Sequence, residues 1–209
     1  MKVVEVIGKF LISVGVGILL FVAWTLWGTR LYTDGQQAAL ADEFGAAPRV
    51  SVSRSGGPPE GYAPARGEAV FRLRIPSIRL IRLVVEGVGS EELRKGPGHY
   101  PECRRGFSPP LCMDFDSPWP GETGRVIVSG HRTTYGQPFW DLDKLERGDE
   151  IVTVTKWGTF TYEVTRKQIV QPTDATIVRP SDVAELVLTT CNPRFSASQR
   201  LIVYAELRR

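Results

Sequence analysis

The sequence contains few of the residues that build metal or nucleic-acid sites. It has three cysteines and two histidines in 209 residues, and no paired C-x-x-C spacing of the kind that holds structural zinc. There is no basic stripe interleaved with aromatic residues, and the net charge is only +3, which gives no ground for nucleic-acid binding. No internal repeat is present. The length and the 42 % hydrophobic content suit one globular domain with appendages.

Charge is absent from Phe10 to Trp27. As a helix, this run is long enough to cross a bilayer core of roughly 30 Å, and Trp24 near its end is typical of an interfacial aromatic belt. A cleaved signal peptide is one alternative, because residues 38–41 include three alanines, but such peptides have apolar cores of roughly 7 to 15 residues and these alanines lie well past the end of the run. A buried soluble helix is another, although the run has no polar face. We predict an uncleaved membrane anchor over residues 1–30.

The charges that flank the run favour one orientation. Lys2 and Lys9 precede it and Arg30 follows it, so the positive-inside rule favours a cytoplasmic N-terminus. We therefore expect a single-pass protein of the cell membrane whose remaining residues are extracellular.

A juxtamembrane segment and tether are predicted over residues 31–67. Residues 34–44 have helix-forming composition. Residues 45–67 are rich in Gly, Pro, Ser and Ala, and such a stretch cannot bury enough apolar surface to order itself. The folded domain is expected over residues 68–209.

That domain has the pattern of a β protein. Helical content is expected to be minor, with one short helix over residues 90–96, N-capped by Ser90, and one or two turns over residues 138–145. Seven or eight short strands separated by Gly and Pro turns predict an antiparallel barrel or sandwich. The clearest strands are expected at residues 70–75, 81–85, 125–129, 150–155, 159–170, 184–190 and 201–207.

Three chemically active side chains stand at the ends of these strands. Cys191 directly follows one apolar run, Arg200 opens the next, and His131 follows a third. We predict that the thiol, the imidazole and the guanidinium converge. Arg194 is interpreted as a solvated charge that flanks a strand.

The other two cysteines, Cys103 and Cys112, bracket a polar loop with prolines in which a disulfide could form without a core. An oxidising environment outside the membrane favours that bridge and leaves Cys191 free. Two alternatives remain: idle reduced thiols, or a metal site that adds His99 and needs a fourth ligand. Otherwise His99, in a Gly-Pro-Gly turn, is structural or adjacent to substrate. We expect a disulfide, no metal and no cofactor.

Several motifs together resemble a known family. The segments around His131, Cys191 and Arg200 resemble, in this order, the His, Cys and Arg motifs of the sortases, and class E most of all. Val187 replaces the threonine that usually opens the Cys motif, and residues 102–117 look like an insertion. The segments that carry the resemblance are Val128–Gly136, Leu188–Ser196 and Gln199–Leu201, with Ile75–Ile78, Gly96–Pro101 and the N-terminal anchor.

The resemblance implies an all-β, eight-stranded sortase-type barrel with short helices, preceded by a transmembrane helix, on the outer face of a Gram-positive membrane. Such enzymes cleave secreted proteins at an LAxTG-like sorting signal between Thr and Gly. They hold the acyl half as a cysteine thioester and transfer it to an amine of a peptidoglycan precursor. By resemblance, Cys191 is the nucleophile, His131 the acid/base and Arg200 the cation near the scissile carbonyl.

These roles agree with elementary chemistry. An unperturbed thiol of pKa about 8.5 is only a few per cent ionised near neutrality, and its ion pair with an imidazole of pKa about 6.5 is a minority species. The imidazole can protonate a leaving amine and later accept a proton from an incoming one. A guanidinium stays charged and can only stabilise developing charge. Two other functions remain as alternatives: a non-catalytic anchored β-barrel that binds ligands, and a hydrolytic cysteine peptidase.

Overall fold

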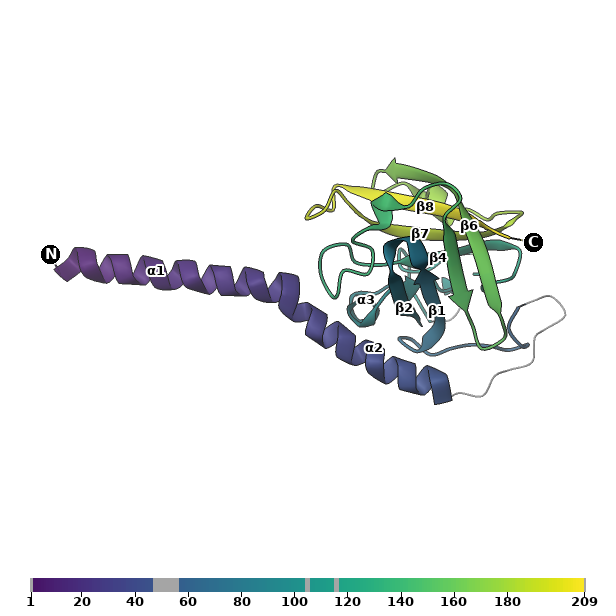
Figure 1. Ribbon diagram of the computed structural model, residues 1–209, viewed down its shortest axis with the longest axis horizontal. Helices are drawn as coiled ribbons and strands as arrows, with labels where there is room; N and C mark the ends of the chain where they lie inside the picture. The colour runs from purple at the N-terminus through teal and green to yellow at the C-terminus, as the bar shows by residue number, and fades with distance from the viewer. Residues whose placement is uncertain (1, 47–56, 104–105, 115–116, 209) are drawn as a thin grey trace.

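The protein consists of a closed β-barrel joined to a long N-terminal helix (Figure 1). The computed structural model describes residues 2–46, 57–103, 106–114 and 117–208. Residues 47–56 of the predicted tether, and residues 104–105 and 115–116 of the predicted insertion, lie outside the described residues.

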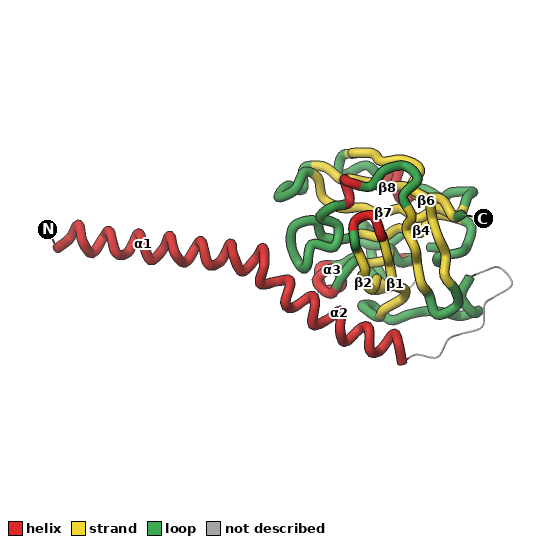
Figure 2. The backbone as a smooth tube through the Cα atoms, viewed as in Figure 1, coloured by secondary structure: helices red, strands yellow, loops and turns green. Residues whose placement is uncertain are grey.

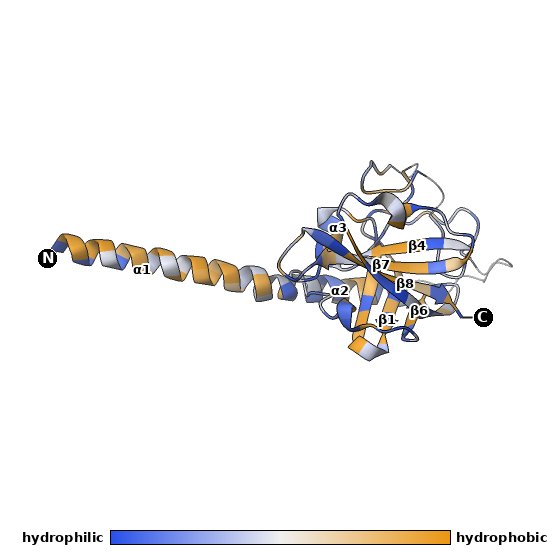
Figure 3. Ribbon diagram, turned by 90° about the horizontal axis from the view of Figure 1, so that it is seen from above, coloured by the Kyte–Doolittle hydropathy of each residue, from blue (hydrophilic) through white to orange (hydrophobic). Residues whose placement is uncertain are grey.

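The N-terminal helix is continuous but changes its winding once. It comprises α1 (Lys2–Ala23), a π-helical segment (Trp24–Gly28) and α2 (Thr29–Ala46). A Cβ atom at position 28 would lie 2.4 Å from the Trp24 ring, so the indole packs closely over Gly28 and would have to move if a larger residue stood there. The apolar part of this helix is long enough to span a membrane, and none of it is buried (Figure 3).

Eight strands close the barrel in the order β1-β2-β3-β4-β7-β8-β6-β5. This confirms the all-β barrel that the resemblance implied, and outside the N-terminal helix the helices are short (Figure 2). The strands are β1 (Ala69–Ile75), β2 (Leu80–Glu86), β3 (Gly98–His99), β4 (Gly124–Ser129), β5 (Glu150–Val154), β6 (Thr159–Val170), β7 (Ala184–Asn192) and β8 (Gln199–Leu207). Among the described residues of the barrel domain, the short helices are α3 (Ser90–Lys95) and the 3-10 segments Pro76–Ile78, Leu142–Lys144 and Ala175–Val178.

The expectation of a purely antiparallel barrel was wrong. The pairs β2–β3 and β4–β7 are parallel, because each is joined by a crossover rather than a hairpin. Alternation of side chains is the same in both kinds of pairing, so the sequence pattern could not separate them. The predicted cap of the short helix was also displaced by one residue, since Gly89 rather than Ser90 occupies the N-cap position of α3.

Part of the predicted tether packs on the barrel. The Tyr62 ring makes edge contacts with Trp119 and Trp157, with centroids 5.0 and 5.2 Å apart, and all three residues belong to the main core or pack against it. The composition of residues 45–67 predicted no packing, but the Tyr62 ring packs part of this segment against the core.

The helix α2 also packs on the barrel. Leu40 is only 6 % exposed and forms a small apolar cluster with Ala69, Leu83 and Val85. The helix predicted over residues 34–44 is therefore present, extends further at both ends, and lies against β2 rather than standing free.

Of the three cysteines, two are bonded to each other. Cys103 and Cys112 form a disulfide with an S–S distance of 2.07 Å, and Cys191 is a free thiol. The bonded sulfurs are not available as metal ligands, and among the described residues no group of three or more His, Cys, Asp or Glu side chains could hold a metal ion.

Candidate active site

The parallel pair β4–β7 brings His131 and Cys191 to the same end of the barrel. Its register runs from Gly124 opposite Ala184 to Ser129 opposite Thr189. Beyond it, the Gly130 amide donates to the Thr189 carbonyl at 3.1 Å. The Thr190 hydroxyl returns a hydrogen bond to the Gly130 carbonyl at 2.7 Å. Gly130 and Thr190, the residues that immediately precede His131 and Cys191, are thus hydrogen-bonded to each other. Both side chains therefore start from the same rim of the barrel, at the ends of β4 and β7.

The antiparallel pair β7–β8 brings Arg200 to the same place. Cys191 and Arg200 are direct partners in the register, and directly opposed residues of an antiparallel pair project from the same face with Cβ atoms about 4.5 to 5.5 Å apart. The thiol of Cys191 is half-buried. Arg200 Nη1 donates to the carbonyls of Ala197 and Gln199, each at 3.0 Å.

Besides His131 and Arg200, the basic side chain of Arg132 lies near this rim. It was not predicted from the sequence as a site residue. It is buried, and its Nη1 donates to the Cys191 carbonyl at 3.3 Å and to Asn192 Oδ1 at 2.7 Å. Its Nη2 lies 3.0 Å from Asp143 Oδ1. Because Arg132 follows His131 in the chain, it fixes the backbone of Cys191 to the loop that carries the imidazole.

The interpretation of Arg194 as a solvated charge was wrong. Its Nη2 lies 3.0 Å from Asp143 Oδ1 and 3.5 Å from Asp141 Oδ1, and also donates to the Trp140 carbonyl. Asp143 therefore bridges Arg132 and Arg194. This network ties the β7–β8 loop to the segment after His131, across separations of about fifty residues that no local pattern could reveal.

His131 is surrounded by Tyr135 and Arg94. Its ring centroid lies 5.1 Å from that of Tyr135, and the Arg94 guanidinium lies over the other ring at 5.7 Å. Burial lowers the pKa of His131 below its ordinary value, and the nearby Arg94 charge lowers this pKa further. Both effects favour the neutral imidazole.

The second histidine lies in the core. His99 is fully buried and stacks on Trp119 with centroids 4.5 Å apart. Its Nδ1 lies 2.8 Å from Glu86 Oε2, and its Nε2 lies 3.1 Å from the Ser117 hydroxyl. These contacts fit the structural alternative. They link β2, β3 and the segment after the disulfide loop.

A comparison with protein families identifies the barrel domain. The model of the sortase domain matches residues 73–208. The chain belongs to the sortase family. Sortases are cysteine transpeptidases, so the protein is an enzyme of that class.

Relatives and solved structures agree with this assignment. Sortase D of Bacillus subtilis is 35 % identical to this sortase over 150 residues, covering 69 % of this chain and 67 % of that protein. Sortase SrtE1 of Streptomyces coelicolor is 30 % identical over 216 residues, covering 96 % of this chain but only 56 % of the longer protein. The structure of sortase E from Streptomyces avermitilis, 33 % identical, matches with a TM-score of 0.56 and covers 70 % of this chain and 91 % of its own. The class E resemblance is thereby confirmed.

The sortase also has a cavity of about 840 Å³ that is separate from this rim. Gly124, Arg125 and Ser181 line it, and these residues lie at or before the starts of β4 and β7. His131 and Cys191 lie at the other ends of the same strands. None of the three predicted site residues, His131, Cys191 and Arg200, lines the cavity.

Replacing Arg94 with glutamine is expected to raise the pKa of His131. The substitution removes a positive charge that disfavours the imidazolium, while burial, the larger cause, still holds the pKa below its ordinary value. NMR titration of the imidazole carbon protons would measure the shift, with His99 as the second signal. Arg94→Lys keeps the charge and should leave the titration unchanged. Equal titrations in the wild type and Arg94→Gln would contradict the electrostatic contact.

Proposed function

We propose that this sortase joins secreted proteins to the cell wall. Residues 1–30 anchor it in the membrane and residues 68–209 form an extracellular catalytic domain. Residues 31–67 connect the two, although their α2 part packs on the domain. The substrates are proteins with an LAxTG-like sorting signal, cleaved between Thr and Gly, and the acceptor is an amine of a peptidoglycan precursor. Cys191 is the nucleophile, His131 the acid/base and Arg200 the electrostatic stabiliser.

One observation carries the assignment of these roles. Cys191 is the direct register partner of Arg200, and the residue before it is hydrogen-bonded to the residue before His131. A nucleophile, a proton carrier and a fixed cation on one rim are the groups that acyl transfer from an amide requires. Arg132, which is bonded to the Cys191 carbonyl, supports their mutual position.

In the first half-reaction, the Cys191 thiolate attacks the carbonyl carbon of the threonine. A C–S bond forms, and negative charge develops on the carbonyl oxygen near Arg200. The C–N bond then breaks as the His131 imidazolium donates its proton to the departing glycine amine. The products are a thioester that joins the amino-terminal half of the substrate to Cys191 and a free carboxy-terminal fragment that begins with the glycine amine.

In the second half-reaction, an acceptor amine attacks the thioester carbonyl. His131, now neutral, accepts a proton from the amine nitrogen. The C–S bond breaks and returns a thiolate to Cys191, so that the thiolate–imidazolium pair is restored. The lowered pKa of His131 suits this proton acceptance, but it makes the starting ion pair a smaller fraction of the enzyme.

The ratio of transfer to hydrolysis tests the proposed function. The full chain in detergent is incubated with a labelled peptide that contains Leu-Ala-Xaa-Thr-Gly, with and without triglycine, and mass spectrometry identifies the products. Transfer predicts an amide product that grows with triglycine concentration at the expense of the acid. An acid product at every triglycine concentration would indicate a hydrolytic peptidase, and peptide binding without cleavage would indicate a non-catalytic barrel.

A further inference from the structure

The end of the membrane-spanning segment can be located on the chain. The apolar run ends at Trp27, and charge returns at Arg30. Trp24 and Trp27 are 63 % and 66 % exposed, and exposed tryptophans at the end of a span usually lie at the level of the lipid headgroups. The π-helical segment Trp24–Gly28 therefore marks the membrane boundary, given the anchoring proposed above.

The loop that follows His131 touches this boundary directly. Gln137 Nε2 donates to the Leu26 carbonyl at 3.2 Å, and the Tyr135 amide donates to the Thr29 hydroxyl at 3.0 Å. Leu26 belongs to the apolar run itself. The loop that carries His131 is thus in contact with the part of the helix that leaves the bilayer.

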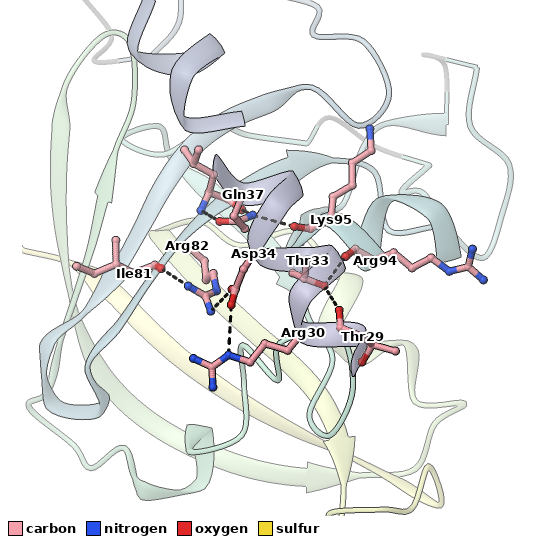
Figure 4. Close-up of polar contacts among 10 residues, drawn as sticks. Thr29, Arg30, Thr33, Asp34, Gln37, Ile81, Arg82, Arg94 and Lys95 are labelled. Atoms are coloured by element: carbon pink, nitrogen blue, oxygen red, sulfur yellow. Dashed lines mark hydrogen bonds and ion pairs between the residues drawn. The ribbon is translucent and has the colours of Figure 1, made fainter. Parts of the chain in front are cut away.

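The next turns of α2 are hydrogen-bonded to the barrel and fix its orientation relative to the helix (Figure 4). Thr33 of α2 is buried, and its hydroxyl donates to the Arg94 carbonyl at 2.8 Å. The Gln37 amide accepts from the Leu83 nitrogen at 2.8 Å and donates to the carbonyls of Leu83 and Lys95 at 3.0 and 2.9 Å.

Gln37 therefore supplies to β2 the hydrogen bonds that a neighbouring strand would give. Asp34 adds an ion pair to Arg82 at 3.3 Å. These contacts come from several turns of one helix, so the domain cannot rotate freely about it.

The Cys191 rim lies at the end of the barrel from which α1 leaves. Figures 1 and 3 show α1 leaving the barrel on the side opposite the C-terminus. Strand β8 begins at Gln199 and ends at Leu207, near the C-terminus, so its first residues lie at the end that α1 leaves. Arg200 and its partner Cys191 belong to that end.

The loop between these two residues carries an exposed aromatic side chain. Phe195 is 68 % exposed, and among the described residues after Tyr32 no large hydrophobic side chain is more exposed. Its φ of 64° is uncommon for an aromatic residue, so the backbone holds it in an unfavourable conformation while the ring remains outside the core. A ring in this position gains from transfer into the lipid interface.

We propose that the barrel rim carrying Cys191 faces the bilayer and that Phe195 contacts the headgroup region of the lipid. The inference rests on the membrane anchoring in the proposed function. Substrates then reach Cys191 from the headgroup layer rather than from open solvent. The partner is a lipid surface, recognised by one apolar side chain beside a fixed membrane span.

Fluorescence quenching by brominated lipids tests this orientation. The full chain with Cys191→Ala, which removes the free thiol, is reconstituted in vesicles of phosphatidylcholine and phosphatidylglycerol. An environment-sensitive dye is attached to one of three new cysteines: Phe195→Cys, Val183→Cys or Leu19→Cys. Val183 is the matched control, because it is also an exposed apolar residue but precedes the start of β7, at the opposite end from Cys191.

Brominated lipids are expected to quench the dye at position 195 several-fold more than the dye at position 183. Quenching of the dye at position 19 shows whether the N-terminal helix is inserted in the membrane. Quenching at position 19 with equal, weak quenching at 183 and 195 would overturn the orientation and leave the anchor intact. No quenching at position 19 would show that the proposed anchoring itself fails. Protection of position 195 by a sorting peptide without lipid quenching would indicate a peptide surface and overturn the proposal.

Discussion

Replacing Cys191 with alanine is expected to abolish both the acyl adduct and turnover. Removal of a catalytic nucleophile lowers kcat on the order of 10⁶-fold in a well-studied protease, and here no second thiol can substitute, because Cys103 and Cys112 are bonded to each other. Mass spectrometry after incubation with a sorting peptide should show the mass increase in the wild type alone.

The structure offers a control for misfolding of this variant. Arg132 bonds to the backbone carbonyl of Cys191 and not to its sulfur, so alanine retains the contact that holds the strand end. The variant should therefore unfold at nearly the same denaturant concentration as the wild type. Cys191→Ser tests the chemistry further, since a hydroxyl of similar size is far less ionised and should form little adduct. An adduct of normal yield in Cys191→Ala would assign the nucleophile to another residue.

The sequence predicted those parts of the fold that local pattern determines. Alternation and turn residues located seven of the strands, whereas β3 (Gly98–His99) contains two residues and is too short to show a period. The pairing of the strands could not be predicted from the sequence in the same way. The choice between parallel and antiparallel neighbours depends on how the connections cross the barrel, and neither alternation nor β-propensity records this.

The residues of the candidate site likewise include some that the sequence predicted and some that it did not. Cys191, His131 and Arg200 could be grouped from sequence because each stands at a strand end and because the motifs resemble a family. Arg132 and Gln37 could not, since their partners lie 59 and 46 residues away. A polar residue on a helix or loop is usually interpreted as solvated. Only the packed structure shows that Arg132 bonds to the Cys191 carbonyl and that Gln37 bonds to the backbone of β2.

Replacing Arg200 with alanine is expected to lower kcat/KM by roughly a hundredfold to a thousandfold, the usual effect of removing a donor that faces a developing oxyanion. The position supports this, because Arg200 is the direct register partner of Cys191. Its Nη1 donates to the carbonyls of Ala197 and Gln199. These bonds hold the guanidinium in one orientation.

Arg200→Lys separates charge from geometry. An ammonium keeps the positive charge but cannot bond to the loop carbonyls and face the substrate with a planar fork, so it should recover less than a tenth of the wild-type kcat/KM. Arg194→Ala is the matched control. It removes a positive charge from the loop that precedes Arg200, but one that is paired with Asp143 and Asp141, and a loss of only a few-fold is expected. Full recovery with lysine would mean that charge alone suffices. Equal losses in Arg200→Ala and Arg194→Ala would mean that both arginines only support the loop.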